Sequence, residues 1–318
     1  MRHALIPALL TLCCLIAPLA HAWHDEGHVY IARGAIEALP EDVPAFFRDG
    51  AEAVAHGSLD PDVIRSRDLP QLRAANYPEH YLDLEYLQGR EWPEDRYAYI
   101  KLCHEMGVEP NTVGTLPYAI AELTQRLTMA FAEHRKHPDN EHIRRKCLVI
   151  AGELSHYTAD LHMPLHTTWH YNGIAPLGDD GMPIADAPKQ HEGIHAAVDA
   201  LPTKLPYNVI FAEPLPEPKP QEELMPLIQA ELLKSHALVD RTYELVEKLP
   251  AMEELAIEDA EVRAFTIDRT RAGAHFTACI FLTAWRNSAE LETPHWLDRN
   301  IFDEDFDPDV VPPQPAHE

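Results

Sequence analysis

Apolar side chains recur every three or four residues along most of the chain. Near its start, Val29, Ala32, Ile36 and Leu39 follow this spacing, and the pattern stops at Pro40. Such a period marks the buried face of an amphipathic helix, which proline ends. No segment of useful length alternates as a strand does, so we expect an all-α fold in a single helical domain. The longest predicted helices cover residues 116–136, 141–162, 221–249 and 257–291.

The first 22 residues have the pattern of a signal peptide. A short basic start precedes an apolar run over residues 4–19, and residues 20–22 read Ala-His-Ala. Small residues at these places are typical of a cleavage site. We therefore predict cleavage between Ala22 and Trp23 and a mature protein that is secreted or periplasmic. A retained anchor is the alternative, although the apolar run is short for a membrane span.

Three segments interrupt or follow the helical pattern. Residues 202–220 are rich in proline, and residues 172–188 contain Asn-Gly and Gly-Asp-Asp-Gly sequences. Both are predicted to be surface loops. Residues 303–318 are acidic and proline-rich, which favours a disordered tail. Residues 23–302 are left as the functional domain.

The acidic charge of the chain limits the classes of partner that it can bind tightly. The chain has 318 residues with 52 acidic and 26 basic side chains, so its formal net charge is −26. Tight binding to duplex nucleic acid depends on many Lys and Arg contacts with phosphates, and such a chain is poorly suited to it. A small cationic site is still compatible with this charge, because bound cations dominate the field close to them. The chain also has 20 histidines, and they cluster.

Cysteine usage points away from a disulfide framework. Beyond the predicted signal peptide there remain only Cys103, Cys147 and Cys279, which allow one disulfide at most. Cys147 and Cys279 lie in apolar helical segments, so we interpret them as small core residues.

The first candidate chemistry is a helical His/Asp pair. His156 and Asp160 are four residues apart, so both side chains project from one face of the predicted helix. This is a common way to present two metal ligands. His166 lies beyond Pro164, which ends or kinks the helix, so it can reach a different metal ion.

A second pair repeats this spacing. His195 and Asp199 are again four residues apart and need a third ligand, for which His166 is the natural candidate. The register His191/His195 is the alternative reading of the same segment.

A tryptophan opens the predicted mature chain, and motifs rich in histidine and aspartate follow it. They are Asp62-x-x-Arg65, His80-Tyr81-Leu82-Asp83, HYTADLHMPLH from His156 to His166, and the His195/Asp199 pair. In this order they resemble the motifs of the superfamily of S1/P1 nucleases and bacterial zinc-dependent phospholipases C. The resemblance implies the all-helical fold of that superfamily.

The resemblance also implies three zinc ions. The first would be bound by Asp62, His80, His156 and Asp160, the second by His166, His195 and Asp199, and the third by the amino terminus of Trp23 with His28 and Asp160. Asp160 would then bridge two ions, and a water shared between them would lose its proton near neutral pH. Asp60 competes with Asp62 as a ligand, but only Asp62 has an arginine three residues later.

Substrate contacts follow from the same comparison. Arg65 would hold a phosphate oxygen in a charge-assisted contact, and Tyr81 would be a stacking platform for a base or head group. The chain departs from the nucleases at Met163, where they have Gln, and it lacks their Gly-Gly-Asn element. It departs from the phospholipases at Ala159 and Trp169. The expected metal ligands are therefore matched better than the expected substrate pocket.

We accordingly expect an exported zinc-dependent phosphodiesterase, a hydrolase of phosphoric ester bonds. The preferred reading is an S1/P1-like endonuclease that cleaves single-stranded nucleic acid and 3′-nucleotides without a stable protein partner. The alternatives are a zinc-dependent phospholipase C acting on phospholipid head groups and, in another class, a zinc-binding protein without turnover. Arg65 argues against the last of these, because metal storage needs no phosphate clamp.

Overall fold

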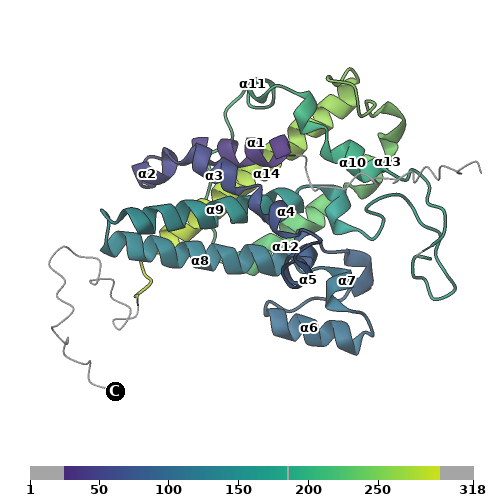
Figure 1. Ribbon diagram of the computed structural model, residues 1–318, viewed down its shortest axis with the longest axis horizontal. Helices are drawn as coiled ribbons and strands as arrows, with labels where there is room; N and C mark the ends of the chain where they lie inside the picture. The colour runs from purple at the N-terminus through teal and green to yellow at the C-terminus, as the bar shows by residue number, and fades with distance from the viewer. Residues whose placement is uncertain (1–24, 185, 294–318) are drawn as a thin grey trace, which may run out of the picture.

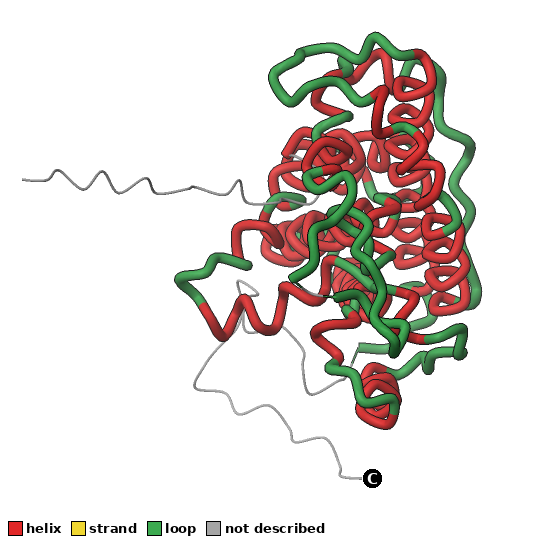
Figure 2. Tube along the Cα trace, turned by 90° about the vertical axis from the view of Figure 1, so that its right-hand side faces the viewer, coloured by secondary structure: helices red, strands yellow, loops and turns green. Residues whose placement is uncertain are grey.

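The computed structural model describes residues 25–184 and 186–293, and this part of the chain is mostly helical. It contains no strand, as Figure 2 shows, so the expected all-α fold is confirmed. The predicted signal peptide, Trp23 and the predicted tail lie outside the described residues. None of the described helices is both long and apolar enough to cross a membrane.

Four long helices form the body of the molecule: α1 (Asp25–Glu37), α8 (Leu116–Lys136), α9 (Glu141–Leu161) and α14 (Ala260–Asn287). α8 and α9 lie side by side, α14 packs against both, and α1 packs against α9 and α14 (Figure 1). The sequence predicted α8 with its observed bounds, and α9 with an error of one residue. Asn140 begins α9 by accepting hydrogen bonds from the amides of His142 and Ile143, a standard helix cap.

Shorter elements surround these four helices. On the amino-terminal side they are α2 (Ala45–Arg48), α3 (Ala51–Gly57), α4 (Asp60–Ile64), α5 (Pro70–Asn76), α6 (Arg96–Glu105) and α7 (Pro110–Val113), with the 3₁₀ turns η1 (Tyr77–His80) and η2 (Leu84–Leu87). After α9 follow η3 (Pro164–Thr167), α10 (Ile194–Asp199), η4 (Pro202–Lys204), α11 (Tyr207–Ile210), α12 (Leu224–His236), α13 (Val239–Glu244) and η5 (Val246–Lys248).

The predicted single helix over 221–249 is wrong, because the chain breaks between α12 and α13. Ile228 and Leu232 of α12 pack into the core formed with α8, whereas Leu245, beyond α13, packs into a second core. One straight helix cannot deliver both sets of side chains. Neither proline nor glycine marks the break. The spacing of apolar residues continues across it, so the sequence pattern does not reveal it.

Two glycines let α3 and α9 approach closely. A Cβ atom added to Gly152 would lie 2.8 Å from the backbone of Gly57, which is too close for any other residue. Farther along α9, the hydroxyl groups of Thr158 and Thr277 are 2.6 Å apart and tie this helix to α14. These contacts fix the carboxyl-terminal half of α9, where the two predicted ligands lie.

The three cysteines beyond the predicted signal peptide are buried and free. Cys103 and Cys147 belong to the larger apolar core, so they act as small core side chains.

Candidate metal centre

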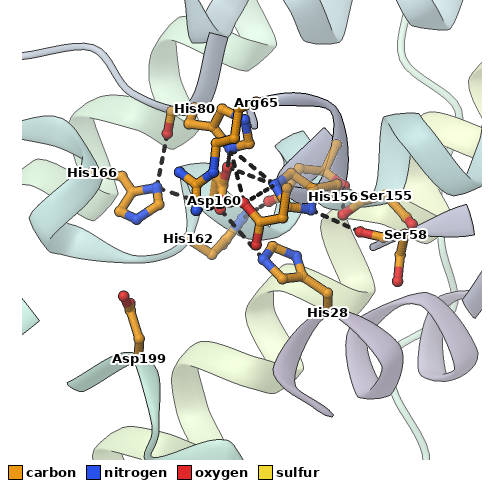
Figure 3. Close-up of polar contacts among 12 residues, drawn as sticks. His28, Ser58, Arg65, His80, Ser155, His156, Asp160, His162, His166 and Asp199 are labelled. Atoms are coloured by element: carbon orange, nitrogen blue, oxygen red, sulfur yellow. Dashed lines mark hydrogen bonds and ion pairs between the residues drawn. The ribbon is translucent and has the colours of Figure 1, made fainter. Parts of the chain in front are cut away.

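The centre is built on the last turns of α9. His156 and Asp160 project from one face of this helix, and His80 reaches them from the end of η1 (Figure 3). His80 Nδ1 lies 3.0 Å from Asp160 Oδ2 and 3.0 Å from His156 Nε2. Asp62 Oδ1 enters from α4 at 3.8 Å from His156 Nε2 and 3.9 Å from His80 Nδ1. Segments far apart in the sequence thus bring four donor groups to one point.

These separations suit a single cation. Four ligands about 2.0–2.1 Å from a tetrahedral zinc ion are about 3.4 Å from one another. The donor atoms of His80, His156 and Asp160 lie 3.0–3.3 Å from one another, and Asp62 Oδ1 lies 3.8–3.9 Å from the two imidazole nitrogens. Three of the residues expected at the first zinc site, His80, His156 and Asp160, therefore form a group that could hold a metal ion, and Asp62 lies beside their imidazoles.

Asp160 directs its two oxygens to different neighbours. Oδ2 faces His80 and His156, whereas Oδ1 lies 3.6 Å from His28 Nε2 and 3.4 Å from His166 Nδ1. A carboxylate placed in this way can bridge two cations. The expected third ligand of the second of these cations, Trp23, is not among the described residues.

His28 offers an independent sign of a missing cation partner. Its side chain is fully buried in α1 and stacks on His156 with ring centroids 3.8 Å apart. Neither ring nitrogen makes a hydrogen bond with any described residue. Buried polar groups are nearly always paired, because leaving them unpaired costs free energy. A cation beside His28 and Asp160 would satisfy one of these nitrogens.

Backbone carbonyls orient the imidazoles. His156 Nδ1 donates to the carbonyl of Ser58 at 2.7 Å, and His166 Nδ1 donates to the carbonyl of His80 at 2.8 Å. Each bond leaves Nε2 as the nitrogen with a lone pair for a metal.

A second group of donors lies beside the first. Donor atoms of His166, His195 and Asp199 lie within 4.8 Å of one another, and His195 Nε2 is 3.0 Å from Asp199 Oδ2. The rings of His166 and His195 are nearly parallel, with centroids 5.1 Å apart. In Figure 3 Asp199 stands apart from the residues around Asp160. These three residues are the ones expected at the second zinc site, and together they could hold a metal ion.

A loop residue that the sequence analysis missed supports this second group. Asn172 Oδ1 accepts hydrogen bonds from the amides of Gly193 (2.9 Å) and His195 (3.4 Å) at the start of α10. The amide of Gly173 in turn donates to the hydroxyl of Tyr243 at 3.0 Å. The Asn-Gly pair in the sequence marked a turn, but nothing in it revealed that the amide oxygen reaches α10.

Burial controls the charge of the first group. Loss of solvent lowers the pKa of His156 to about 4 and takes the pKa values of His28 and His80 well below the ordinary histidine value. Loss of solvent also raises the pKa of Asp160 well above its ordinary value, although the nearby Arg65 opposes the shift. Without a cation these groups are held neutral, and a bound cation would displace the proton from Asp160.

His195 behaves differently. Burial alone would lower its pKa, but the charge and hydrogen bond of Asp199 outweigh burial and raise the pKa. The Nδ1 of His195 also lies 3.2 Å from the carbonyl of Tyr171. Asp199 therefore favours the protonated form of His195 in the absence of metal.

The donors open into a cavity of about 440 Å³. Its wall is rich in aromatic side chains, namely Tyr77, Tyr81, Tyr86, Trp169 and Tyr171, and His80, His166 and His195 reach it from the donor groups. Arg65 also lines it, with its guanidinium 2.7 Å from Asp62 Oδ1. The hydroxyl of Tyr81 donates to the carbonyl of Asn111 at 2.5 Å, which holds its ring in place at the wall.

The sequence left two choices open: Asp60 or Asp62 as a ligand, and His191 or Asp199 as the partner of His195. Asp62, and not Asp60, contributes an oxygen to the donor groups found among the described residues. His191 is exposed, and its ring faces Tyr243 at 6.2 Å rather than Asp199.

Comparisons with known proteins add little. No protein-family model and no curated protein matches the chain. A solved structure titled "Alpha Toxin from Clostridium Absonum" aligns with a TM-score of 0.38 and 15% sequence identity, over 86% of this chain and 66% of that one. Similarity at this level does not assign the chain to a family, so its function is argued from the donor geometry.

Proposed function

We propose that the chain is a zinc-dependent phosphodiesterase of the S1/P1 nuclease–phospholipase C type that binds three ions. The observation that carries the proposal is the arrangement around Asp160. One of its oxygens lies 3.0–3.3 Å from the donor nitrogens of His80 and His156, a spacing that suits zinc ligands, while the other faces His28 and His166. Storage of metal needs no such sharing between adjacent sites, whereas hydrolysis of phosphate esters uses it.

Zinc bound at these donors would supply Lewis acidity and lower the pKa of water in the cavity. The chain's own part is to position the phosphate. Arg65 lies at the cavity wall beside Asp62, which holds its guanidinium in place. A guanidinium at this wall is suited to contact a non-bridging phosphate oxygen, where charge develops during displacement.

The preferred substrate is single-stranded nucleic acid or a 3′-nucleotide. An unpaired base can stack on the aromatic wall that includes Tyr81, whereas a base inside a duplex is not available for stacking. The net charge of −26 also disfavours long-range attraction of a polyanion. We therefore expect the local cavity, and not the surface, to determine affinity.

A phospholipid is the second candidate, and one observation favours it. Three side chains that line the cavity, Tyr77, Tyr171 and Ile184, are also exposed large hydrophobic residues. An apolar rim around a phosphodiesterase site suits an amphiphilic substrate. The aromatic wall can also hold a cationic head group through cation–π contacts.

The amino terminus forms a separate part of the proposal. If Trp23 becomes the first residue after export, its free amine can bind the zinc shared by His28 and Asp160. A single added alanine before Trp23 would turn that amine into an amide, so the longer form should lose one zinc and its activity. Equal zinc content and turnover in both forms would show that Trp23 is not a ligand.

The main test compares substrates on the zinc-loaded mature protein. Single-stranded DNA, RNA, a 3′-nucleotide, phosphatidylcholine and bis(4-nitrophenyl) phosphate are assayed side by side, and metal content is measured on the same sample. We expect about three zinc ions per chain and cleavage of single strands well above duplex. Turnover of phosphatidylcholine alone would replace the nuclease reading by the phospholipase reading. If the protein binds zinc but hydrolyses none of these esters, only the reading as a non-catalytic zinc-binding protein remains.

A further inference from the structure

A second cavity adjoins the first. It measures about 500 Å³, and Tyr77, Tyr81 and Asn111 line both cavities. Because the ring of Tyr81 is tied to Asn111 at this shared wall, a ligand that stacks on Tyr81 can extend into both spaces. The two cavities are therefore neighbouring parts of one larger surface.

The second cavity has an unusual charge for this protein. Arg67 and Arg73 line it, and no acidic side chain does. The whole chain has 52 acidic and 26 basic residues. A cavity lined by two arginines and no carboxylate is therefore unlike the composition of the chain as a whole. Among the described residues, no carboxylate forms an ion pair with either arginine. Their positive charge is therefore available to an anionic ligand.

Arg73 is also held in position. Its NH1 group donates to the carbonyl of Arg65 at 2.7 Å, and its guanidinium lies 4.3 Å from the centroid of the Tyr77 ring. Arginine on an aromatic ring loses little freedom when it binds, and its planar fork fits the oxygens of a phosphate. The same hydrogen bond connects Arg73 to the backbone of Arg65, the proposed phosphate ligand of the first cavity.

We propose that Arg67 and Arg73 form a second phosphate subsite, which binds a neighbouring phosphate of the strand that is cleaved beside Arg65. This inference rests on the proposed phosphodiesterase function and narrows its substrate to a chain with several phosphates. A base on Tyr81 would lie between the two subsites. A phospholipid with one phosphate cannot occupy both, so the subsite favours single-stranded nucleic acid.

The test measures how the length of an oligonucleotide affects binding. Thymidylates of two and four residues compete against hydrolysis of bis(4-nitrophenyl) phosphate by the zinc-loaded mature protein. We expect the tetramer to bind the wild type about 10- to 100-fold more tightly than the dimer. In R67Q/R73Q this ratio should fall close to one, and the salt dependence of tetramer binding should weaken by about 1.4 in log–log slope.

Two further variants separate the causes. R67Q alone leaves the hydrogen bond between Arg73 and Arg65 in place, so a partial loss of the length effect there cannot come from a disturbed Arg65. R144Q/R145Q removes the same charge at the start of α9, about 17 Å along the helix from His156, and should keep the full length effect. An unchanged ratio in R67Q/R73Q, or an equal loss in R144Q/R145Q, would overturn the subsite.

Failure of the subsite can be distinguished from failure of the proposed function. If the wild type hydrolyses no ester, that function has failed, and fluorescence anisotropy with the same labelled oligonucleotides then decides the subsite alone. If R67Q/R73Q loses binding to anionic phospholipid vesicles while keeping the length effect, the arginines serve a lipid surface and the strand proposal is wrong.

Discussion

The two donor groups use the same residue types but are held in different ways. The group around Asp160 is assembled from α1, α4, η1 and α9, within the packed helices of the body. The group around Asp199 takes two donors from α10, a helix of six residues, and its start is fixed by Asn172 in a loop. The first site is thus held by the packed helices, and the second partly by a loop contact from Asn172.

The two groups also differ in the pKa shifts of their histidines. Burial lowers the pKa of His156, whereas Asp199 raises the pKa of His195. In the first group burial favours the neutral forms and leaves both ring nitrogens of His28 without a hydrogen bond, while in the second group Asp199 favours the protonated form of His195. Metal binding at the first group therefore relieves a penalty, and at the second it must replace an existing interaction.

The strongest test of this contrast replaces the two aspartates in turn. Asp160→Asn should lose two zinc ions together and reduce turnover by at least on the order of 10³-fold, because that carboxylate faces both neighbouring sites. Asp199→Asn should lose one ion. Elemental analysis and hydrolysis of bis(4-nitrophenyl) phosphate measure both. Loss of a single ion from Asp160→Asn would show that Asp160 is not a bridge.

The hydrogen bonds by which the loop residue Asn172 holds the start of α10 can be removed by mutation. Asn172→Leu removes the oxygen that accepts from the start of α10, so zinc affinity at the second site should fall by about 10- to 100-fold, as for other residues that orient ligands. Asn172→Asp retains an oxygen there and should recover much of this loss. Stepwise zinc titration distinguishes the sites. Equal weakening of all sites would point to a general loss of fold instead.

The electrostatic contrast predicts opposite responses to acid in metal-free protein. The folded-state pKa of His156 is about 4 against an ordinary 6.5. The fold therefore loses stability as pH falls below 6.5, because His156 stays neutral when folded and gains a proton when unfolded. At pH 5 this cost is about 2 kcal/mol, and His156→Gln should remove it.

The His195→Gln variant should do the reverse. The raised pKa of His195 gives stability below pH 6.5 that is lost as pH rises through the folded-state value. This variant should therefore be less stable than the wild type at pH 5 and similar to it at high pH. Urea unfolding at both pH values measures the sign, and identical signs for the two variants would contradict the contrast.

The smallest effect concerns a residue outside both groups. Tyr81→Ala removes the stacking surface, so KM for single-stranded substrates should rise about tenfold while kcat changes less. Tyr81→Phe keeps the ring and loses only the hydrogen bond to Asn111, so its effect should be smaller. Zinc content should stay unchanged in both. A fall in kcat at constant KM would mean that Tyr81 acts on the reaction itself.

Local periodicity revealed the parts of the molecule that depend on nearby residues. α8 and α9 were predicted almost residue by residue, because each buries one continuous face. The break after α12 was not, since it depends on two separate cores that only the folded chain creates. The same distinction applies to the centre. The His/Asp pairs four residues apart are visible in the sequence, whereas the carbonyls of Ser58 and His80 that orient the imidazoles have no side-chain signature.

The close contact between Gly57 and Gly152 has a consequence for how this protein can change over time. His156 donates to the carbonyl of Ser58, the residue directly after Gly57, so the spacing of α3 and α9 also sets the direction of a proposed ligand. A methyl group on Gly152 would push the helices apart and rotate the imidazole away from its neighbours. In a mutational library this remote, chemically inert position should accept as few substitutions as the ligands themselves.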